Sequence, residues 1–380
     1  MNYKLLKPLP HQQRVIDWNP NKAILNHEMR VGKSLPACHW VDNPCRSKNS
    51  YIITLKSNKQ EWIDYGTNAT VITKEEFKKL MLSGSIINPT AVVFDEAHKG
   101  AGKLFVKKRS QLAVDFYNLV KEYPECHILL LSATVVTNSP YSLHTLLCFV
   151  GIYIDWKEWR GMFFELKMKP FLRFPTWMPK DNWRKLMKPM EIKYTDIIAL
   201  KDVVKDLPPA ETRIIDIKQK KYEKPTDEVV TWTHEHQHEQ EGKIKEILEL
   251  GYKKIIVVCR YTDQINELAK ELSKYKPVFI LNGHTKDQDK TIKEAQDSEE
   301  CYFIVQSKCG EGWDGYMFSC MVFVSMDHSN SAHTQMLGRQ RHPKHLKVTE
   351  TIYINGGRWD RRIYKCVMEG RMFNPHVYAS

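Results

Sequence analysis

Two short polar runs, far apart in the sequence, have the residue types needed to bind and hydrolyse a nucleotide. Asp-Glu-Ala-His occupies residues 95–98 directly after the apolar run 91–94, and Gly-Lys-Ser occupies residues 32–34. A Gly-Lys-Ser turn can direct backbone N–H groups and a lysine at phosphate oxygens, and a hydroxyl at Mg²⁺. At the end of a buried strand, Asp95 can hold Mg²⁺ through water while Glu96 polarises the attacking water. Together the two runs predict a site for Mg-nucleotide hydrolysis.

The upstream loop departs from the commonest phosphate-loop spacing. In Gly-x-x-x-x-Gly-Lys-Ser/Thr the first glycine would fall at position 27, where this chain has His27. Gly-Lys-Ser by itself is common by chance, so the prediction depends on the paired carboxylates. The alternative for Asp95 and Glu96 is that they only cap a helix.

Composition disfavours several classes of protein. The chain has 380 residues, a formal net charge of +12 and nine cysteines, none of which form Cys-x-x-Cys pairs. No stretch approaches the ~20 apolar residues of a membrane span, and the N-terminus does not resemble a secretory signal. We therefore expect a cytoplasmic protein in a reducing compartment, without a zinc ribbon. The positive charge favours polyanionic partners such as nucleic acid.

The apolar runs predict two α/β domains. Short β-branched or aromatic runs alternate with longer helix-like stretches, and this rhythm occurs twice with a break between. Near-continuous apolar runs of this kind are typical of parallel strands buried on both faces. We expect the domains at residues 1–150 and 243–380. The runs lie at 51–55, 91–94, 127–131, 254–259, 278–281, 302–305, 321–325 and 351–354.

The first intervening segment, residues 151–205, loses the strand rhythm and concentrates aromatic and basic residues. Between 151 and 190 it has nine Lys/Arg against four Asp/Glu, interleaved with tryptophan and phenylalanine. The aromatic rings could stack bases or clamp a duplex. Alternatively, they form the core of a small helical insertion with the lysines outside. We favour the core for most of the aromatic residues, with a basic face that includes Arg184 and Lys185 directed toward nucleic acid.

The second intervening segment, residues 206–242, is predicted to be a linker followed by a polar stretch. The run Leu-Pro-Pro at 207–209 favours a stiff extended connection, because proline cannot continue a helix and restrains the residue before it. His234, His236 and His238 are close enough in the sequence to bind a metal together. No Cys or Asp joins them at ligand spacing, so a solvated surface is the favoured interpretation.

Taken in order, these runs and several others resemble the motifs of superfamily 2 helicases and translocases. The loop Glu-Met-Arg-Val-Gly-Lys-Ser at 28–34 is especially similar to the Glu-Met-Gly-x-Gly-Lys-Thr loop of the Swi/Snf-type branch, which also lacks the first glycine. The other motifs are the Q motif at 9–12, motif II (DEAH) at 95–98, motif III at 132–134, motif IV at 255–261, motif V at 307–314 and motif VI at 335–341. So many motifs in the family's order are hard to reach by chance.

The resemblance implies two RecA-like parallel-sheet α/β domains in tandem, with a nucleotide cleft between them and the small helical insertion described above. It implies ATP and Mg²⁺ as ligands, and ATP hydrolysis as the reaction. The catalytic residues that it implies are Lys33, Asp95, Glu96, Arg339 and Arg341. For ATP binding it implies Gln12 at the adenine edge, together with Arg30, Val31, Gly32, Lys33, Ser34, Gly312 and Asp314. Ser34 and Asp95 would hold Mg²⁺.

Motif VI departs from the family's pattern in one place. The family usually has Gln-x-x-Gly-Arg-x-x-Arg, yet His342 stands at the final arginine position and Arg341 falls one residue early. An arginine here would place a planar cation on charge that develops at the γ-phosphate. Arg339 fits the first arginine directly, whereas Arg341 fits the second only if the local turn shifts by one residue. The alternative for both is a surface arginine.

The resemblance also implies residues that couple hydrolysis to movement and residues that contact a nucleic-acid track. The coupling residues would be His98, Ser132, Ala133, Thr134 and Gln335. Basic and hydroxyl side chains can contact a phosphate backbone without reading bases, which makes binding salt-sensitive and nearly independent of sequence. The candidates are Thr54, Lys56, Ser57, Arg260, Ser307 and Lys308. The alternative for each is an ordinary solvated loop residue.

The implied function is an ATP-driven motor on nucleic acid, with DNA favoured over RNA. Strand separation, branched-DNA remodelling and translocation without unwinding all stay open, as do an RNA helicase and a nucleic-acid-binding protein with an inactive motor core. An unrelated phosphate-loop kinase is disfavoured because it needs no second α/β domain with Gln-x-x-Gly-Arg. The compact length is similar to that of bacteriophage-encoded DNA helicases, which would place the chain in the host cytoplasm. We expect a monomer, with replication, repair or recombination proteins as partners.

Overall fold

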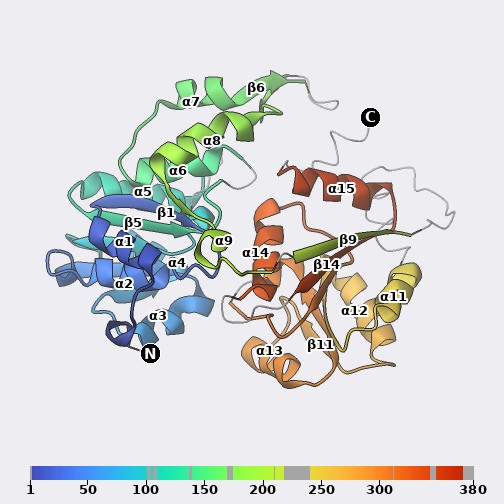
Figure 1. The fold of residues 1–380 in the computed structure, drawn as a ribbon. Helices are drawn as coiled ribbons and strands as arrows, with labels where there is room; N and C mark the ends of the chain where they lie inside the picture. The colour runs from blue at the N-terminus through green and yellow to red at the C-terminus, as the bar shows by residue number, and fades with distance from the viewer. Residues whose placement is uncertain are drawn as a thin grey trace. The chain divides into compact units, whose positions relative to one another are not determined.

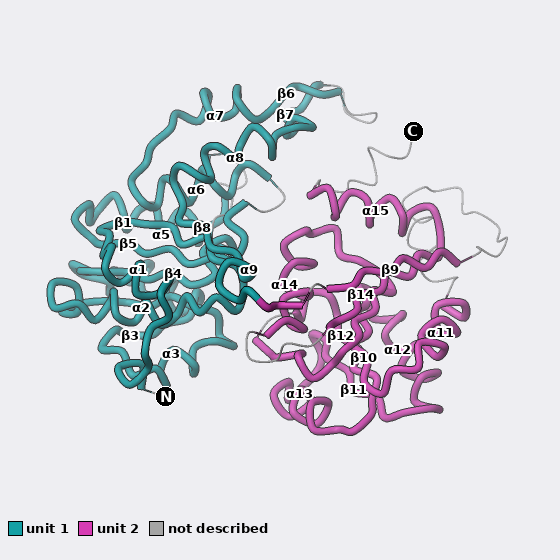
Figure 2. Tube along the Cα trace, in the orientation of Figure 1, with its two compact units in different colours: residues 1–205 teal, residues 206–380 magenta. Residues whose placement is uncertain are grey.

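The computed structural model describes residues 2–100, 104–105, 109–136, 139–168, 174–208, 210–217, 240–310, 312–342 and 348–370. The chain divides into two compact units, residues 1–205 and residues 206–380 (Figure 2). Each unit is built on a sheet of six strands. Among the described residues, no helix has the length and apolar character to cross a membrane.

The first unit has a sheet in the strand order β3-β2-β4-β5-β1-β8, and every neighbouring pair in it is parallel. Two of its strands, β1 and β5, are labelled in Figure 1. Its strands are β1 (Lys22–His27), β2 (Ser50–Thr54), β3 (Thr70–Thr73), β4 (Ala91–Phe94), β5 (His127–Ser132) and β8 (Asp196–Ile198). Because all six run in the same direction, their carboxyl ends lie at one edge of the sheet. The loop 28–34, which contains Gly-Lys-Ser, begins at that edge directly after β1, and the Asp-Glu-Ala-His run begins there directly after β4.

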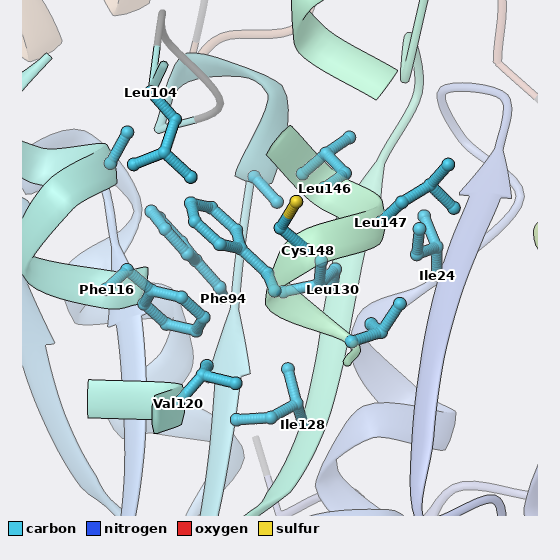
Figure 3. Packing of buried hydrophobic residues seen from close by; sticks show 14 of the residues in the cluster. Ile24, Phe94, Leu104, Phe116, Val120, Ile128, Leu130, Leu146, Leu147 and Cys148 are labelled. Carbon is cyan, nitrogen blue, oxygen red and sulfur yellow. The ribbon is translucent and has the colours of Figure 1, made fainter. Parts of the chain in front are cut away.

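Side chains alternate between the two faces of this sheet along each strand, and both faces are buried. Phe94 and Leu130 point to one face, where they pack with Phe116 of α5 (Figure 3). Val93 and Leu129 point to the other face and pack with Trp62 of α3. The helices of the two faces are α1 (Pro10–Trp18), α2 (Ser34–Val41), α3 (Lys59–Tyr65), α4 (Lys74–Leu82), α5 (Gln111–Glu122) and α6 (Tyr141–Phe149). Burial on both faces explains why β4 and β5 are continuous apolar runs.

Residues 151–205 belong to the first unit and contain more strand than their sequence predicts. The expected helices are present, and so are an antiparallel hairpin and β8, which extends the first sheet beside β1. The elements are α7 (Trp156–Phe163), β6 (Phe164–Lys167), β7 (Thr176–Pro179), α8 (Trp183–Tyr194), β8 and α9 (Leu200–Val203). These strands have three or four residues each and are only partly buried, so they lack the apolar signature of the inner strands.

Most of the aromatic residues in this segment do form a core, as expected. Trp159 and Trp183 are buried in the same cluster as Phe94, and Trp156 packs against that cluster. The exceptions are Tyr153, Phe174 and Trp177, whose side chains remain substantially exposed. Arg173, one of the basic residues of this segment, lies outside the described residues.

The second unit repeats the architecture with the strand order β11-β12-β10-β13-β14-β9, again parallel throughout. Its strands are β9 (Ala210–Asp216), β10 (Lys254–Cys259), β11 (Val278–Leu281), β12 (Cys301–Gln306), β13 (Cys320–Phe323) and β14 (Thr349–Asn355). The helices are α11 (Gln240–Glu249), α12 (Thr262–Leu272), α13 (Gln288–Asp297), α14 (Asn330–Gln340) and α15 (Arg358–Met368). Residues of β10 alternate between two clusters, one shared with α11 and α12 and the other with α14 and α15.

The predicted linker at 206–242 contains the edge strand β9. Six of its seven residues are exposed, so it has no apolar run to reveal it. Pro209 and the three histidines at 234, 236 and 238 lie outside the described residues. Within the described ranges, no group of three or more His, Cys, Asp or Glu side chains is placed to hold a metal ion.

Candidate functional site

The loop between β1 and α2 has the backbone of a phosphate-binding turn. Arg30 and Gly32 both have positive φ, at 67° and 83°. A Cβ atom added to Gly32 would collide with the side-chain nitrogen of Gln12, so a larger residue would displace that side chain as well as strain the backbone. Val31 between them is buried, and Ser34 is the first residue of α2. The chain therefore turns sharply into a helix N-terminus, where backbone N–H groups are available to an anion.

Lys33 lies back across this loop. Its ammonium nitrogen donates to the carbonyl oxygens of His27 at 2.9 Å and Glu28 at 3.4 Å. The cation is thus held at the centre of the turn rather than extended into solvent. This is the position from which a lysine can reach phosphate oxygens bound by the same loop.

Helix α1 braces the loop from one side. The Gln12 side chain accepts from the Leu9 backbone N–H at 2.8 Å and donates to the Gly32 carbonyl at 2.9 Å. His11 Nε2 lies 2.8 Å from the Val31 carbonyl oxygen. The structure thus gives Gln12 a role in holding the loop, while its predicted contact with adenine stays a prediction.

The other side of the loop is tied to the end of the 151–205 segment. Three consecutive residues, Asn26, His27 and Glu28, hydrogen-bond to Glu191, Asp196 and Leu200 respectively. Burial lowers the pKa of His27 although Asp196 opposes this, so the ring is a neutral hydrogen-bonding group at pH 7. No sequence motif marks these partners, because they lie more than a hundred residues further along the chain.

Asp95 is buried directly after β4, and its carboxylate is fixed by four donors. Oδ2 accepts from the Thr54 hydroxyl at 2.8 Å, the Trp62 indole N–H at 3.1 Å and the Asn58 amide at 3.4 Å. Oδ1 accepts from the Glu96 backbone N–H at 2.9 Å. Trp62 and Asn58 are site residues that motif spacing missed. An ordered carboxylate of this kind is a suitable ligand for Mg²⁺.

Glu96 has left-handed backbone, with φ 47°, which is costly for a residue with a side chain. Its carbonyl oxygen accepts from the ammonium group of Lys74 at 3.0 Å, and its Oε2 lies 3.2 Å from His98 Nδ1. Lys74 is buried at the start of α4, and its sequence context identifies only a helix start. The Lys74 contact fixes the Glu96 backbone, and the carboxylate lies beside the His98 ring.

The structure brings together the residues predicted to couple hydrolysis to movement in the first unit. His98 Nδ1 lies 2.9 Å from the Ser132 hydroxyl, and the Thr134 backbone N–H donates to the same oxygen at 3.0 Å. Burial, with the charges of Lys74, Lys99 and Lys33, lowers the pKa of His98 to about 3. A neutral His98 therefore connects the carboxylate run after β4 with the end of β5.

Next to this connection is a cavity of about 400 Å³ within the first unit. Ala133 and Thr134 line one side, and Arg184 with Lys188 of α8 line another. Arg184 is half-buried with its guanidinium 4.7 Å from the Trp183 ring centroid, whereas Lys185 is exposed. Of the two basic residues predicted to face nucleic acid, only Lys185 is freely accessible.

Thr54, predicted to contact nucleic acid, is instead fully buried with its hydroxyl committed to Asp95. Lys56 and Ser57 follow it in a short 3-10 helix and are exposed, as a track contact requires. The cause is the strand register: Ile53 of β2 is paired with Phe94 of β4, so the next residues, Thr54 and Asp95, lie side by side at the ends of the two strands.

Thr54→Val should lower ATP turnover even without nucleic acid. The substitution keeps the shape of the side chain and removes one donor from a buried carboxylate, which should reduce the free energy of unfolding by about 1–3 kcal/mol. Urea denaturation and basal ATP hydrolysis measure the two effects. Unchanged basal turnover with weakened nucleic-acid binding would return Thr54 to the predicted track.

In the second unit, motif VI and motif V are joined by hydrogen bonds. Arg339, in the last turn of α14, donates from Nε to the Gly310 carbonyl at 2.6 Å and from Nη1 to the Trp313 carbonyl at 3.0 Å. Gly312 between these carbonyls has φ 77° and is exposed. Arg341 directly follows the helix in extended backbone. Glu311 lies outside the described residues.

The remaining second-unit candidates differ in accessibility. Asp314 is half-buried and its carbonyl accepts from Gln296, while Gln335 is buried on α14. Arg260 follows β10 and is half-buried, with its backbone N–H bonded to Ser325. Ser307 is buried after β12 and Lys308 beside it is exposed. Arg260, Ser307 and Lys308 lie at the carboxyl edge of the second sheet, since Cys259 and Gln306 are paired in register.

The fold is similar to that of a known helicase domain. The crystal structure of the Pyrococcus furiosus Hef helicase domain matches with a TM-score of 0.53 and 12% sequence identity, covering 96% of this chain and 99% of that one. Neither a protein-family model nor a curated protein matches the sequence. The chain has two parallel-sheet α/β domains that match the tandem RecA-like fold of that helicase domain, which confirms the predicted fold class. At this identity the likeness concerns the fold alone.

Proposed function

We propose that the chain is a nucleic-acid-stimulated ATPase that works as a helicase or translocase. One observation carries the proposal: the carboxyl edge of the first sheet holds both the Lys33 loop and the ordered Asp95–Glu96 pair. The side chains of a hydrolytic nucleotide site thus come from separate strand ends and have defined hydrogen-bond partners. A helix-capping role for Asp95 is disfavoured, because a capping carboxylate accepts mainly from backbone N–H groups of the helix. Three of the four donors to Asp95 are side chains, and only one is a backbone N–H.

The loop after β1 would bind the phosphates of ATP. Backbone N–H groups at the start of α2 and the Lys33 ammonium supply positive charge for the β- and γ-phosphates. Ser34 and Asp95 supply the hard oxygen donors that Mg²⁺ prefers, and α3 connects them, because Trp62 bonds to Asp95 and Tyr65 interacts with Ser34. Mg²⁺ bound there would neutralise phosphate charge.

Glu96 is the group we assign to polarise the attacking water. Its carboxylate lies 3.2 Å from His98 Nδ1, and its backbone carbonyl is held by Lys74. Arg339, and with it Arg341, is assigned to stabilise the charge that develops on the γ-phosphate. Since Arg339 bonds to two motif V carbonyls, a change at motif V would also move this cation.

Coupling would pass from Glu96 through His98 to Ser132 and Thr134. A shift of Glu96 during hydrolysis changes the hydrogen bond that its neighbour His98 makes with Ser132, and Thr134 is bonded to the same hydroxyl. Lys56, Ser57, Arg260 and Lys308 are the side chains that we propose to contact the phosphate backbone. Their exposure or position at the ends of strands supports this assignment.

DNA is the proposed track, and the Swi/Snf-like branch the proposed relationship. The support is the loop at 28–34, whose sequence resembles that branch and also lacks the first glycine. We further propose that the protein is a monomer, that it is encoded by a bacteriophage, and that it works in the host cytoplasm with replication, repair or recombination proteins.

Steady-state ATP hydrolysis by the purified chain tests the proposed function. Turnover should rise at least about tenfold when the correct nucleic acid is added, and the comparison of single-stranded DNA, duplex DNA, branched DNA and RNA names the track. If RNA stimulates turnover most strongly, then RNA and not DNA is the track. No turnover with any of them would leave a binding protein with an inactive motor.

A further inference from the structure

The β6–β7 hairpin is anchored at its base by an aromatic cluster. Phe164, the first residue of β6, is buried with its ring centroid 4.9 Å from that of Tyr141 and 5.8 Å from that of Trp156. At the other strand, Lys180 donates to the carbonyl oxygens of Gly161 and Met162 at the end of α7. The hairpin is therefore fixed against α7, beside which it is seen in Figure 1.

Beyond this base, several of the hairpin's described residues carry exposed apolar side chains. Leu166 lies two residues after Phe164, on the same face of the hairpin, and is paired with Trp177 across the strands. The exposed fraction is 53% for Leu166 and 40% for Trp177, and it reaches 64% for Met168 and 77% for Phe174. Single exposed apolar residues are ordinary, but four on one hairpin mark a surface that takes a partner.

Arg160 connects this apolar surface with positive charge. Its guanidinium lies 4.3 Å from the centroid of the Trp177 ring, which is a cation–π contact from α7 to β7. The contact holds the indole in one orientation and places the Arg160 cation beside Trp177 on the hairpin. We refer to Arg160, Leu166, Met168, Phe174 and Trp177 as the hairpin platform.

The charge around the platform selects the kind of partner. Among the described residues between 156 and 188 there are seven Lys/Arg and three Asp/Glu. Two of those lysines are already paired, Lys167 with Glu165 and Asp181, and Lys188 with Glu191. The uncompensated positive charge beside exposed aromatic rings is typical of surfaces that stack bases and neutralise a phosphate backbone.

We propose that the hairpin platform binds single-stranded nucleic acid, with a base stacked on Trp177 and the adjoining phosphate on Arg160. This inference rests on the proposed function and adds a contact site outside the motifs that predict the track. The end of the same segment bonds to Asn26, His27 and Glu28 at the nucleotide loop. A strand held by the platform would therefore be linked to the nucleotide site by hydrogen bonds within the first unit.

The test compares two ligands of equal length and charge, a fluorescein-labelled oligo(dT) and its abasic counterpart, by fluorescence anisotropy with the full chain. Wild type should bind oligo(dT) more tightly than the abasic strand. Trp177→Ala should weaken oligo(dT) binding by about tenfold and leave abasic binding almost unchanged, because stacking needs bases. Trp177→Phe should restore most of the difference. Arg160→Ala should weaken both ligands and reduce the dependence on salt.

Trp18→Ala is the matched control, because Trp18 is 50% exposed at the end of α1, away from the platform. It should leave both affinities as in wild type. If Trp177→Ala loses affinity equally for oligo(dT) and the abasic strand, or loses none for either, the platform is overturned. The proposed function would still stand if the wild type binds nucleic acid and its ATP hydrolysis is stimulated. Absence of binding by the wild type would overturn both. Thermal unfolding of each variant identifies any that fail to fold. If Trp177→Ala is one of them, Trp177→Phe tests the platform: it should bind oligo(dT) more tightly than the abasic strand, and loss of that preference would overturn the platform.

Discussion

Lys33→Ala should reduce ATP turnover on the order of 10³-fold, with or without nucleic acid. The ammonium group lies over the centre of the loop between β1 and α2, where it donates to the His27 and Glu28 carbonyls. With ATP bound, the same cation would offset phosphate charge, and this attraction grows as charge moves during phosphoryl transfer. The substitution also removes much of the affinity for ATP. Steady-state hydrolysis and binding of a fluorescent ATP analogue measure the two losses.

The matched control for Lys33 is Lys79→Ala, which removes the same charge from an exposed position on α4. Its turnover should equal that of wild type. Equal turnover in Lys33→Ala would mean that the loop binds no nucleotide for hydrolysis, and the site assignment would be withdrawn. Loss of turnover together with a lower melting temperature would indicate unfolding instead, because the Lys33 side chain also bonds its own loop.

Glu96→Gln should bind ATP about as well as wild type and hydrolyse it about 10²- to 10⁴-fold more slowly. Glutamine has the same length and keeps an oxygen near His98, so the loop geometry should survive. It has no carboxylate to polarise water, which is why chemistry should stop while binding continues. Single-turnover hydrolysis and equilibrium ATP binding separate these two steps.

Glu75→Gln, an exposed first-turn residue of α4, controls for loss of one negative charge and should turn over normally. If Glu96→Gln binds no ATP, then the contact between Glu96 and His98 is a structural support for the loop after β4. If it hydrolyses ATP at the wild-type rate, then another group activates the water. The contrast with Lys33→Ala is informative, because only the lysine variant should lose affinity.

Much of the fold was predictable from the sequence because the inner strands are buried on both faces. β4, β5, β10 and β12 are continuous apolar runs, and their boundaries in the structure agree closely with the runs. The same criterion does not detect β1, which ends in the polar pair Asn26 and His27. Those two residues are buried only because Glu191 and Asp196, far along the chain, accept their hydrogen bonds. It also misses β9, which is exposed along nearly its whole length.

The candidate site was predictable in its motifs and not in its supports. Lys33, Asp95 and Glu96 occur in runs whose residue types already suggest phosphate and water chemistry. Trp62 and Lys74 occur in ordinary helical sequence, and nothing near them signals a contact with that site. They hold the Asp95 carboxylate and the Glu96 carbonyl because α3 and α4 each begin near the carboxyl edge of the sheet.

By itself the sequence determined the two α/β domains, the order of the motifs and the charge of the 151–205 segment, since all of these depend on local chain order. Only the tertiary structure decided which side chains meet. It turned Thr54 to Asp95 instead of to a track, and it buried Trp159 while leaving Trp177 exposed on the hairpin. The physical reason is that burial and hydrogen bonding depend on what distant segments place beside a residue. Local pattern carries no record of those neighbours.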